Sequence, residues 1–552
     1  MILIALTKSE KIRHQILECR DLTKISDTIF LNKQNDTIEG RVYGEHYESL
    51  KKGVPPQLEE APRGEYSVLN INEKEINLYV DPNGYRHIYR YSADDLEVVS
   101  NDFEGIFNFL KKLKLVLSPS YETTLASLLM GVAFYPGTGI REIKLLNTNQ
   151  YINIDIANEV LCVKNRNYIE YADLVFNKKI PRSDLLQIVI ERLKQTAQEI
   201  LTQNSSKEKI VEVTGGSDSR LVLGTLLANN FKDFKVYTFG KIDSLDQRVS
   251  QQIQNLFNLQ SINYVNDLTK LHAAQNRWMI TAGAFLPVDI SYRSAFKRDA
   301  FLSFAGTGGE LGRGYFTKQT YNKNYNSRQD IKIVDDVSSF RKLIENYSLR
   351  HLLTDEFKWL IATESANYYK DFPYSKELHM LLDYAFFQSR LRWHFGKQTE
   401  LRDQLFIETP AIMNDFLFHM LIFSVNHIER ISDKNVYDLL NLLYPPLNYL
   451  PFTNPPKFDE NVSKRMFINL PQQRTSTPLK CIDRSKGIDR DAMSDREEIE
   501  TIFYEFIENE NYNRFIIKDK FISIMNSQKK DIILDKFAPL LYWHHNTKFS
   551  FR

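Results

Sequence analysis

The chain has 552 residues, and its 43% hydrophobic and 26% charged side chains are typical of globular proteins, not of disordered ones. Its 71 basic and 70 acidic residues leave a formal net charge of +1, so no overall field favours a nucleic acid or an anionic membrane as partner. At about 150 residues per domain the length alone allows roughly three or four domains.

Cysteine usage and the apolar segments point to a cytoplasmic protein. Cys19, Cys162 and Cys481 lie far apart and form no CxxC pair, so we expect neither a disulfide framework nor a cysteine zinc site. The N-terminal residues carry their charges after a short apolar run, the reverse of a secretory signal. The most apolar long stretch, 411–425, is interrupted by polar residues and is predicted to be a buried helix, not a membrane span.

Short strand-like runs separated by turns fill the first part of the chain. They favour β-branched and aromatic residues, and turn residues at 81–84 and 92–95 separate some of them. This pattern predicts a layered β-sheet domain over residues 1–170. The runs are residues 76–80, 87–91, 96–100, 143–146 and 151–156.

The pattern changes near Pro181. Ser183 is predicted to cap a helix whose apolar residues recur at helical spacing as far as Leu201. Helices beginning near 219 and 246 then alternate with strands, which predicts a parallel sheet covered by helices on both faces. The expected strands are 210–214, 236–239, 261–265 and 301–305. We assign residues 180–552 to this second domain; it is mainly helical from about 335, with 455–552 as loop and helical tail.

The segment 211–220, VEVTGGSDSR, is the most informative part of the chain. Its two adjacent glycines permit a tight turn that brings backbone N–H groups close to a ligand, and the following helix start adds unpaired N–H groups and a positive dipole end. An aspartate beside a phosphate indicates a bridging Mg²⁺. A plain strand-to-helix turn with capping side chains is the alternative. The candidate ATP ligands in this loop are Thr214, Gly215, Gly216, Ser217, Asp218 and Ser219.

Residues 214–219 resemble the S-G-G-x-D-S pyrophosphate loop of the asparagine synthetase family of ATP pyrophosphatases, with threonine in place of the first serine. The resemblance implies an α/β protein. Its N-terminal domain would be a glutaminase-like Ntn αββα sandwich, and its C-terminal domain a parallel-sheet ATP-pyrophosphatase domain of the adenine nucleotide α-hydrolase type with a helical extension. It also implies that Val213 and the pair Thr238 and Phe239 line the adenosine pocket.

A second segment, AGTGGELGRGY at 305–315, is similar to the second loop of the family, S-G-[DE]-G-x-D-E-x-F-G-G-Y. Glu310 takes the place of the carboxylate that helps to hold Mg²⁺, so the resemblance implies that Asp218 and Glu310 bind the metal. Gly306 is expected to contact ATP, and Arg313 is a candidate for binding pyrophosphate. Looser similarities extend the resemblance over roughly residues 60–450.

Three departures from the family pattern change the expected chemistry. Ile2 stands where glutamine-dependent members have a nucleophilic cysteine, so the N-terminal domain is predicted to be degenerate, as in relatives similar to β-lactam synthetase and lasso-peptide cyclases. Thr307 replaces an acid or a tyrosine and is a poor base. The catalytic lysine that the family implies lies downstream. Lys480 and Lys486, in a loop-like segment, are chosen over Lys457 and Lys464, and a solvated basic patch is the alternative.

We therefore expect an ATP-dependent carbon–nitrogen ligase that adenylates a substrate carboxylate, releases pyrophosphate and lets an amine displace AMP, with ATP and Mg²⁺ as cofactors. The partner is a small-molecule or peptide substrate with a carboxylate and an amine, with no nucleic acid or membrane. An ammonia-dependent asparagine synthetase is the nearest alternative. A nucleotide-binding sensor or assembly protein without turnover is the alternative of another class. A sulfur-transferring enzyme acting on tRNA is disfavoured by the few cysteines and the neutral charge.

Overall fold

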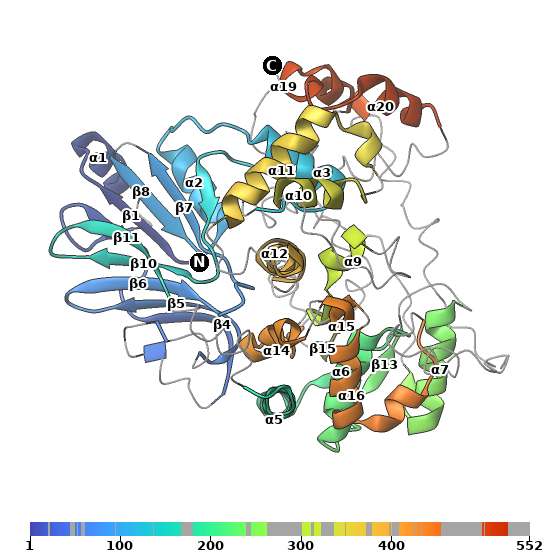
Figure 1. Cartoon of the computed structure of the whole chain (residues 1–552). Helices are drawn as coiled ribbons and strands as arrows, with labels where there is room; N and C mark the ends of the chain where they lie inside the picture. The colour runs from blue at the N-terminus through green and yellow to red at the C-terminus, as the bar shows by residue number, and fades with distance from the viewer. Residues whose placement is uncertain are drawn as a thin grey trace.

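A computed structural model gives the arrangement of the chain (Figure 1). It describes residues 1–166, 180–261, 301–321, 336–453 and 500–527, apart from short gaps within these ranges. The gaps are residues 20–21, 45–49, 52, 54, 57–60, 94, 136, 239–243, 311–313, 348, 371–377, 397–398, 400–407, 426, 432 and 502.

Two antiparallel sheets are built from the first 165 residues, as the strand-like runs predict (Figure 1). The first sheet has the strand order β2-β3-β1-β8-β7-β9, and the second has the order β11-β10-β6-β5-β4. The strands are β1 (Leu3–Thr7), β2 (Thr23–Lys24), β3 (Ile29–Leu31), β4 (Thr37–Tyr43), β5 (Arg63–Ile71), β6 (Glu75–Val80), β7 (Tyr89–Ala93), β8 (Leu96–Ser100), β9 (Ile143–Leu145), β10 (Gln150–Asp155) and β11 (Val160–Asn165).

Alternating side chains of both sheets form one apolar cluster. Ile4 and Leu6 on β1 join Leu78 on β6 and Ile152 on β10, and Ile2 is wholly buried among them. The pleat sends successive side chains to opposite faces, so Leu3 and Ala5 of the same strand lie in a second apolar cluster. The helices of this region are α1 (Glu10–Glu18), α2 (Phe103–Lys112) and α3 (Tyr121–Met130), and α2 packs on β7 and β8.

A four-stranded parallel sheet with the order β14-β13-β12-β15 follows, which confirms the predicted parallel sheet. Its strands are β12 (Glu208–Glu212), β13 (Lys235–Tyr237), β14 (Gln260–Ser261) and β15 (Phe301–Phe304). The chain moves outward from β12 to β14 and then returns to place β15 on the other side of β12. The helices around this sheet are α5 (Arg182–Gln203), α6 (Ser217–Ala228), α7 (Leu245–Phe257), α16 (Lys434–Leu443) and the 3₁₀ turn η8 (Pro445–Tyr449).

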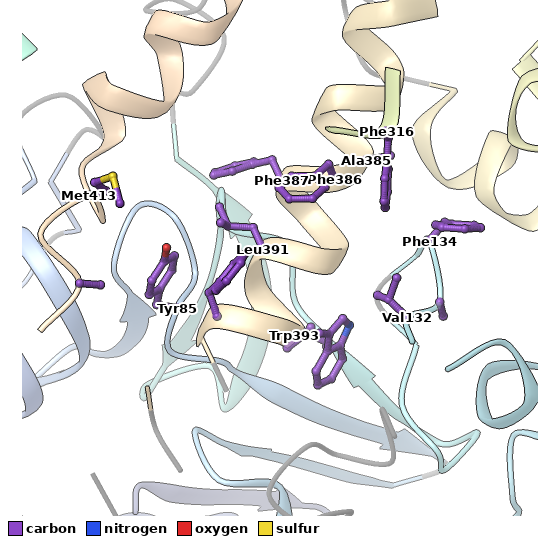
Figure 2. Packing of buried hydrophobic residues seen from close by; sticks show 14 of the residues in the cluster. Tyr85, Val132, Phe134, Phe316, Ala385, Phe386, Phe387, Leu391, Trp393 and Met413 are labelled. Atoms are coloured by element: carbon purple, nitrogen blue, oxygen red, sulfur yellow. The ribbon is translucent and has the colours of Figure 1, made fainter. Parts of the chain in front are cut away.

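The later part of the described chain is helical, as predicted from about residue 335. Aromatic side chains join it to the segment between α3 and β9: Phe316 makes edge-to-face contacts with Phe134 of that segment and with Phe386 (Figure 2). The elements are α9 (Tyr315–Tyr321), α10 (Asp336–Ile344), η5 (Arg350–Leu352), α11 (Asp355–Tyr369), α12 (Leu378–Phe386), the π-helix η6 (Phe387–Gly396), α14 (Phe416–Leu421), η7 (Ile422–Ser424), α15 (His427–Ile431), α19 (Glu510–Asn513) and α20 (Lys518–Met525).

Two predicted helix starts are wrong. Helix α5 begins at Arg182 with Pro181 at its N-cap, so Ser183 lies inside the first turn, where its hydroxyl donates to Asp184. The helix expected over 411–425 begins only at Phe416, because the carboxylate of Asp415 accepts the N–H groups of the next turn and caps it there. This stretch is buried as predicted, and within the described residues no helix combines the length and apolarity needed to cross a membrane.

Candidate nucleotide site

Residues 213–216 form a tight loop between β12 and α6. The strand ends at Glu212, two residues earlier than predicted, and the helix begins at Ser217. The N–H of Thr214 donates to Ser219 Oγ at 3.0 Å, and the hydroxyl oxygens of these two residues are also 3.0 Å apart. Gly216 N–H donates to Thr214 Oγ1 at 3.2 Å. Thr214 and Ser219 therefore hold the loop closed, in addition to any contact with a ligand.

The N-terminus of α6 opens toward the same loop. Gly216 is the N-cap residue and supplies no side chain to accept the first N–H groups of the helix. Ser217 and Asp218 occupy the first turn, with Ser217 Oγ 3.4 Å from Asp218 Oδ1. Uncapped N–H groups and the positive end of the helix dipole make this position suited to an anion.

The second glycine-rich segment lies directly against the first loop. A Cβ atom at position 306 would lie 2.8 Å from the backbone nitrogen of Ser219, and one at position 309 would lie 2.6 Å from both Cβ and Cγ of Asp218. Only glycine permits so close an approach. The two motifs, at 214–219 and 305–315, thus meet at Asp218, and Glu310 directly follows Gly309.

The place where the loops meet is the switch point of the parallel sheet. Strand β12 pairs with β13 on one side and with β15 on the other, and the loops follow the C-terminal ends of β12 and β15. The hydroxyl of Ser303 donates to Glu212 at 2.7 Å and joins these two strand ends. Ligands of open parallel sheets bind at such points, where neighbouring connections diverge and leave a crevice.

The pair Asp218 and Glu310 has the donor chemistry that Mg²⁺ prefers. Among the described residues no group of three or more His, Cys, Asp or Glu side chains could hold a metal ion by itself. Mg²⁺ commonly binds through one or two carboxylates together with phosphate oxygens and water. Asp218 and Glu310 are two such carboxylates, and phosphate oxygens and water would have to complete the ligand set.

A turn from the N-terminal sheets reaches the second loop. Tyr85 is fully buried, and a Cβ atom at Gly308 would lie 2.5 Å from its hydroxyl oxygen. Burial, followed by the charges of Glu310, Glu65 and Asp81, holds the pKa of Tyr85 well above its usual value, so the phenol keeps its proton. The second loop is thus enclosed between Asp218 on one side and Tyr85 on the other.

The turn that carries Tyr85 is fixed by Asp81. Its carboxylate accepts the N–H groups of Asn83, Tyr85 and Arg86 at 3.2, 3.1 and 2.9 Å. Burial raises the pKa of Asp81 to about 6 against these hydrogen bonds. Gly84 has a φ of +66°, which glycine adopts without strain. Strand β7 begins at Tyr89, two residues later than the sequence predicts.

Three contacts at the first loop were not predicted from the sequence. Asp246 and Thr453 both hydrogen bond to Gly215, and the buried guanidinium of Arg220 holds the segment that leads to Thr453. The sequence predicts only that a helix begins near residue 246. No local signal marks Thr453, because its partners lie more than 200 residues away.

The other predicted site residues divide into two groups. Val213 is fully buried and its N–H donates to the carbonyl of Tyr237 on the neighbouring strand at 2.8 Å, next to the expected adenosine pocket. Thr307 is buried in the second loop. The remaining candidates lie outside the described residues: Phe239, Arg313, Lys457, Lys464, Lys480 and Lys486.

Comparison with protein-family models finds no match to this chain, and comparison with curated proteins finds none either. The resemblance to the asparagine synthetase family therefore depends on the two motifs and on the way the structure places them. The mixed α/β architecture, with antiparallel sheets followed by a four-stranded parallel sheet and helices, is established by the strand pairing.

Proposed function

We propose that this protein is an ATP-dependent ligase that joins a carboxylate to an amine through an acyl-adenylate. The observation that carries the proposal is the meeting of residues 214–219 and 305–310 at Asp218, at the switch point of the parallel sheet. The pairing of β12 with β15 brings the two loops side by side, but it does not by itself require glycines and carboxylates where they meet. A shared metal-nucleotide site accounts for both the glycines and the carboxylates.

The first half-reaction assigned to the site activates the carboxylate. A carboxylate oxygen of the substrate attacks the α-phosphorus of ATP, the bond from that phosphorus to the bridging oxygen breaks, and its electron pair leaves on pyrophosphate. The N–H groups at the start of α6 would hold the phosphate oxygens and stabilise the charge that develops on them. When bound, Mg²⁺ held by Asp218 and Glu310 would neutralise part of that charge.

The second half-reaction forms the amide. The amine attacks the carbonyl carbon of the acyl-adenylate, loses a proton and displaces AMP. Thr307 is a poor proton acceptor, so we place the lost proton on water or on the departing phosphate, and not on this side chain. Lys480 and Lys486 stay the candidates for stabilising the transition state. The proposal includes no glutamine hydrolysis, in keeping with the residue at position 2.

The choice of Lys480 and Lys486 rests on the sequence, because both lie outside the described residues. Replacing each by alanine is expected to slow pyrophosphate release while leaving the affinity for Mg·ATP nearly unchanged.

The direct test measures pyrophosphate release from ATP in a mixture of amino acids, dicarboxylic acids and short peptides, with and without Mg²⁺. We expect Mg²⁺-dependent release that Asp218→Asn lowers at least about a hundredfold, since the metal loses one of its two carboxylates. Asp233→Asn, at an exposed acidic residue between α6 and β13, is the matched control and should keep full activity.

The competing assignment is a nucleotide sensor without turnover. It predicts that the protein binds Mg·ATP, that Asp218→Asn weakens this binding, and that no mixture of carboxylates and amines yields pyrophosphate. If Asp218→Asn changes neither binding nor turnover, the two loops are a structural turn and neither assignment holds.

A further inference from the structure

Gly215 is held from two distant parts of the chain. Asp246, in the first turn of α7, accepts the N–H of Gly215 on its Oδ1 atom at 2.8 Å. Thr453 donates its own N–H to the carbonyl of Gly215 at 2.9 Å. Its hydroxyl donates to the same Asp246 Oδ1 atom at 3.0 Å. These three hydrogen bonds close a ring in which both polar backbone groups of Gly215 have fixed partners.

The ring requires glycine at its centre. A Cβ atom at position 215 would lie 2.5 Å from Thr453 Oγ1 and 3.0 Å from Asp246 Oδ1. Any side chain there would push both partners away from the backbone. Gly215 is therefore needed for the contact with Asp246 and Thr453, independently of its contact with a ligand.

Arg220 holds Thr453 in this place. Its guanidinium is fully buried and donates to the carbonyls of Leu447 and Leu450 at 2.9 and 3.0 Å, and also to that of Pro451. It stacks on the ring of Phe452 at 3.6 Å from the ring centre. The residue that follows the phosphate loop in sequence thus fixes the last residues before Thr453.

We propose that Asp246 and Thr453 are positioning residues of the nucleotide site, which they serve by setting the orientation of the Gly215 peptide groups. With the N–H of Gly215 engaged by Asp246 and its carbonyl by Thr453, the next N–H groups, at the start of α6, are directed to the phosphates. This inference rests on the proposed function, because it assigns these residues to the same ATP site. The inference extends the proposed nucleotide site by a third segment, residues 447–453, beside the two glycine-rich loops.

An alternative role for Asp246 predicts the opposite effect of its removal on ATP binding. If its carboxylate stood in the place of a phosphate oxygen, ATP would have to displace it, and removing it would strengthen binding. The geometry favours positioning, because the same oxygen atom serves Gly215 and Thr453 together and the ring would open if Asp246 moved away.

The test compares Mg·ATP binding by calorimetry, and thermal unfolding, in matched pairs of variants. Asp246→Asn and Thr453→Ser retain the acceptor and the hydroxyl, so we expect dissociation constants within about threefold of the unmodified protein. Asp246→Ala and Thr453→Val remove them, and we expect binding to weaken by about tenfold or more. Thermal unfolding separates a loss of folding from a loss of binding in each variant, and Asp233→Ala, at an exposed position, is the control.

Equal binding by all four variants overturns the inference, and so does tighter binding by Asp246→Ala. If the alanine and valine variants do not fold, the conservative pair decides, and a tenfold loss in both of its members counts against positioning through the acceptor and the hydroxyl. Absence of Mg·ATP binding in the unmodified protein would remove the proposed function and this inference with it. Binding that is present but insensitive to all four changes removes the inference alone.

Discussion

Gly309 lies so close to Asp218 that a Cβ atom at position 309 would come within 2.7 Å of the Oδ1 atom of the aspartate. The second loop thus determines where the carboxylate of the first loop can point. Since the neighbour is the candidate metal ligand itself, a change at Gly309 should affect ligand binding more than it affects folding.

Gly309→Ala is therefore expected to weaken Mg·ATP binding by about tenfold or more, because the new methyl group displaces the Asp218 side chain. Overpacking of this kind costs about 1–3 kcal/mol, and the exposed part of the aspartate can move to relieve it. Calorimetric titration measures the affinity, and urea unfolding measures the stability. Unchanged affinity in a folded Gly309→Ala protein would show that Asp218 does not contact the nucleotide.

Gly308 and Tyr85 give a second prediction, which concerns packing between the N-terminal sheets and the second loop. Gly308→Ala should destabilise the protein, since Gly308 has a φ of +94° and its new Cβ would lie 2.5 Å from the phenol oxygen. Tyr85→Phe removes that oxygen and leaves the ring carbon 3.8 Å away, an ordinary contact. The loss of unfolding free energy caused by Gly308→Ala should therefore be smaller by at least about 1 kcal/mol in a Tyr85→Phe protein than in the unmodified protein.

Tyr85→Phe alone tests what the buried tyrosine hydroxyl contributes to stability. The hydroxyl has no hydrogen-bond partner in the described part of the chain, and a buried polar group without a partner is costly. Tyr85→Phe should accordingly leave the ligand-free protein as stable as before, or more stable by about 1 kcal/mol, in a calorimetric unfolding experiment. A clear loss of stability would mean that the hydroxyl has a partner within the protein.

Arg220 is expected to be among the costliest residues to replace. Burial lowers its pKa to about 9, still above neutral, so the buried guanidinium stays charged at pH 7 while three carbonyls and an aromatic ring surround it. Arg220→Ala should lower the free energy of unfolding by about 3 kcal/mol or more, because the carbonyls lose their donors. Arg220→Lys should recover only part of this, since an ammonium cannot reproduce the planar fork. Equal stability of all three proteins in urea would contradict this role.

The buried His419 is expected to make the stability of the protein depend on pH. It is fully buried beside Phe387 and Phe418, and burial lowers its pKa to about 3, against the opposing charge of Asp415. An unfolded histidine takes up its proton near pH 6.5, whereas the folded one stays neutral down to about pH 3. Stability is therefore lost as the pH falls below 6.5, by about 2 kcal/mol between pH 7 and pH 5.

His419→Phe keeps the aromatic contacts but cannot titrate, so this part of the pH dependence should disappear. Urea unfolding at pH 7 and pH 5 gives the difference for each protein, and comparison of the two differences isolates His419 from the other titrating groups. An equal loss in both proteins would show that His419 is protonated in the folded state or exposed to water.

Much of the fold could be predicted because it depends on local pattern. Runs of β-branched and aromatic residues predict strands near 76–80, 96–100 and 151–156, and all three are strands in the structure. The exact ends were less predictable. Pro181, not Ser183, is the N-cap residue of α5, and α14 begins only after Asp415. The start of a helix depends on which residue before it keeps a non-helical backbone conformation.

Some features of the candidate site could be predicted from the sequence, and others required the structure. The sequence by itself determined the two glycine-rich loops, the carboxylates Asp218 and Glu310 and the parallel direction of the strands, because these features follow from neighbouring residues and their spacing. Only the tertiary structure decided that Gly309 meets Asp218 and that Asp246 and Thr453 share Gly215. Asp246 and Thr453 are 207 positions apart, and Thr453 is still farther from Gly215 in the sequence. No local periodicity encodes which distant segments the folded sheet brings together.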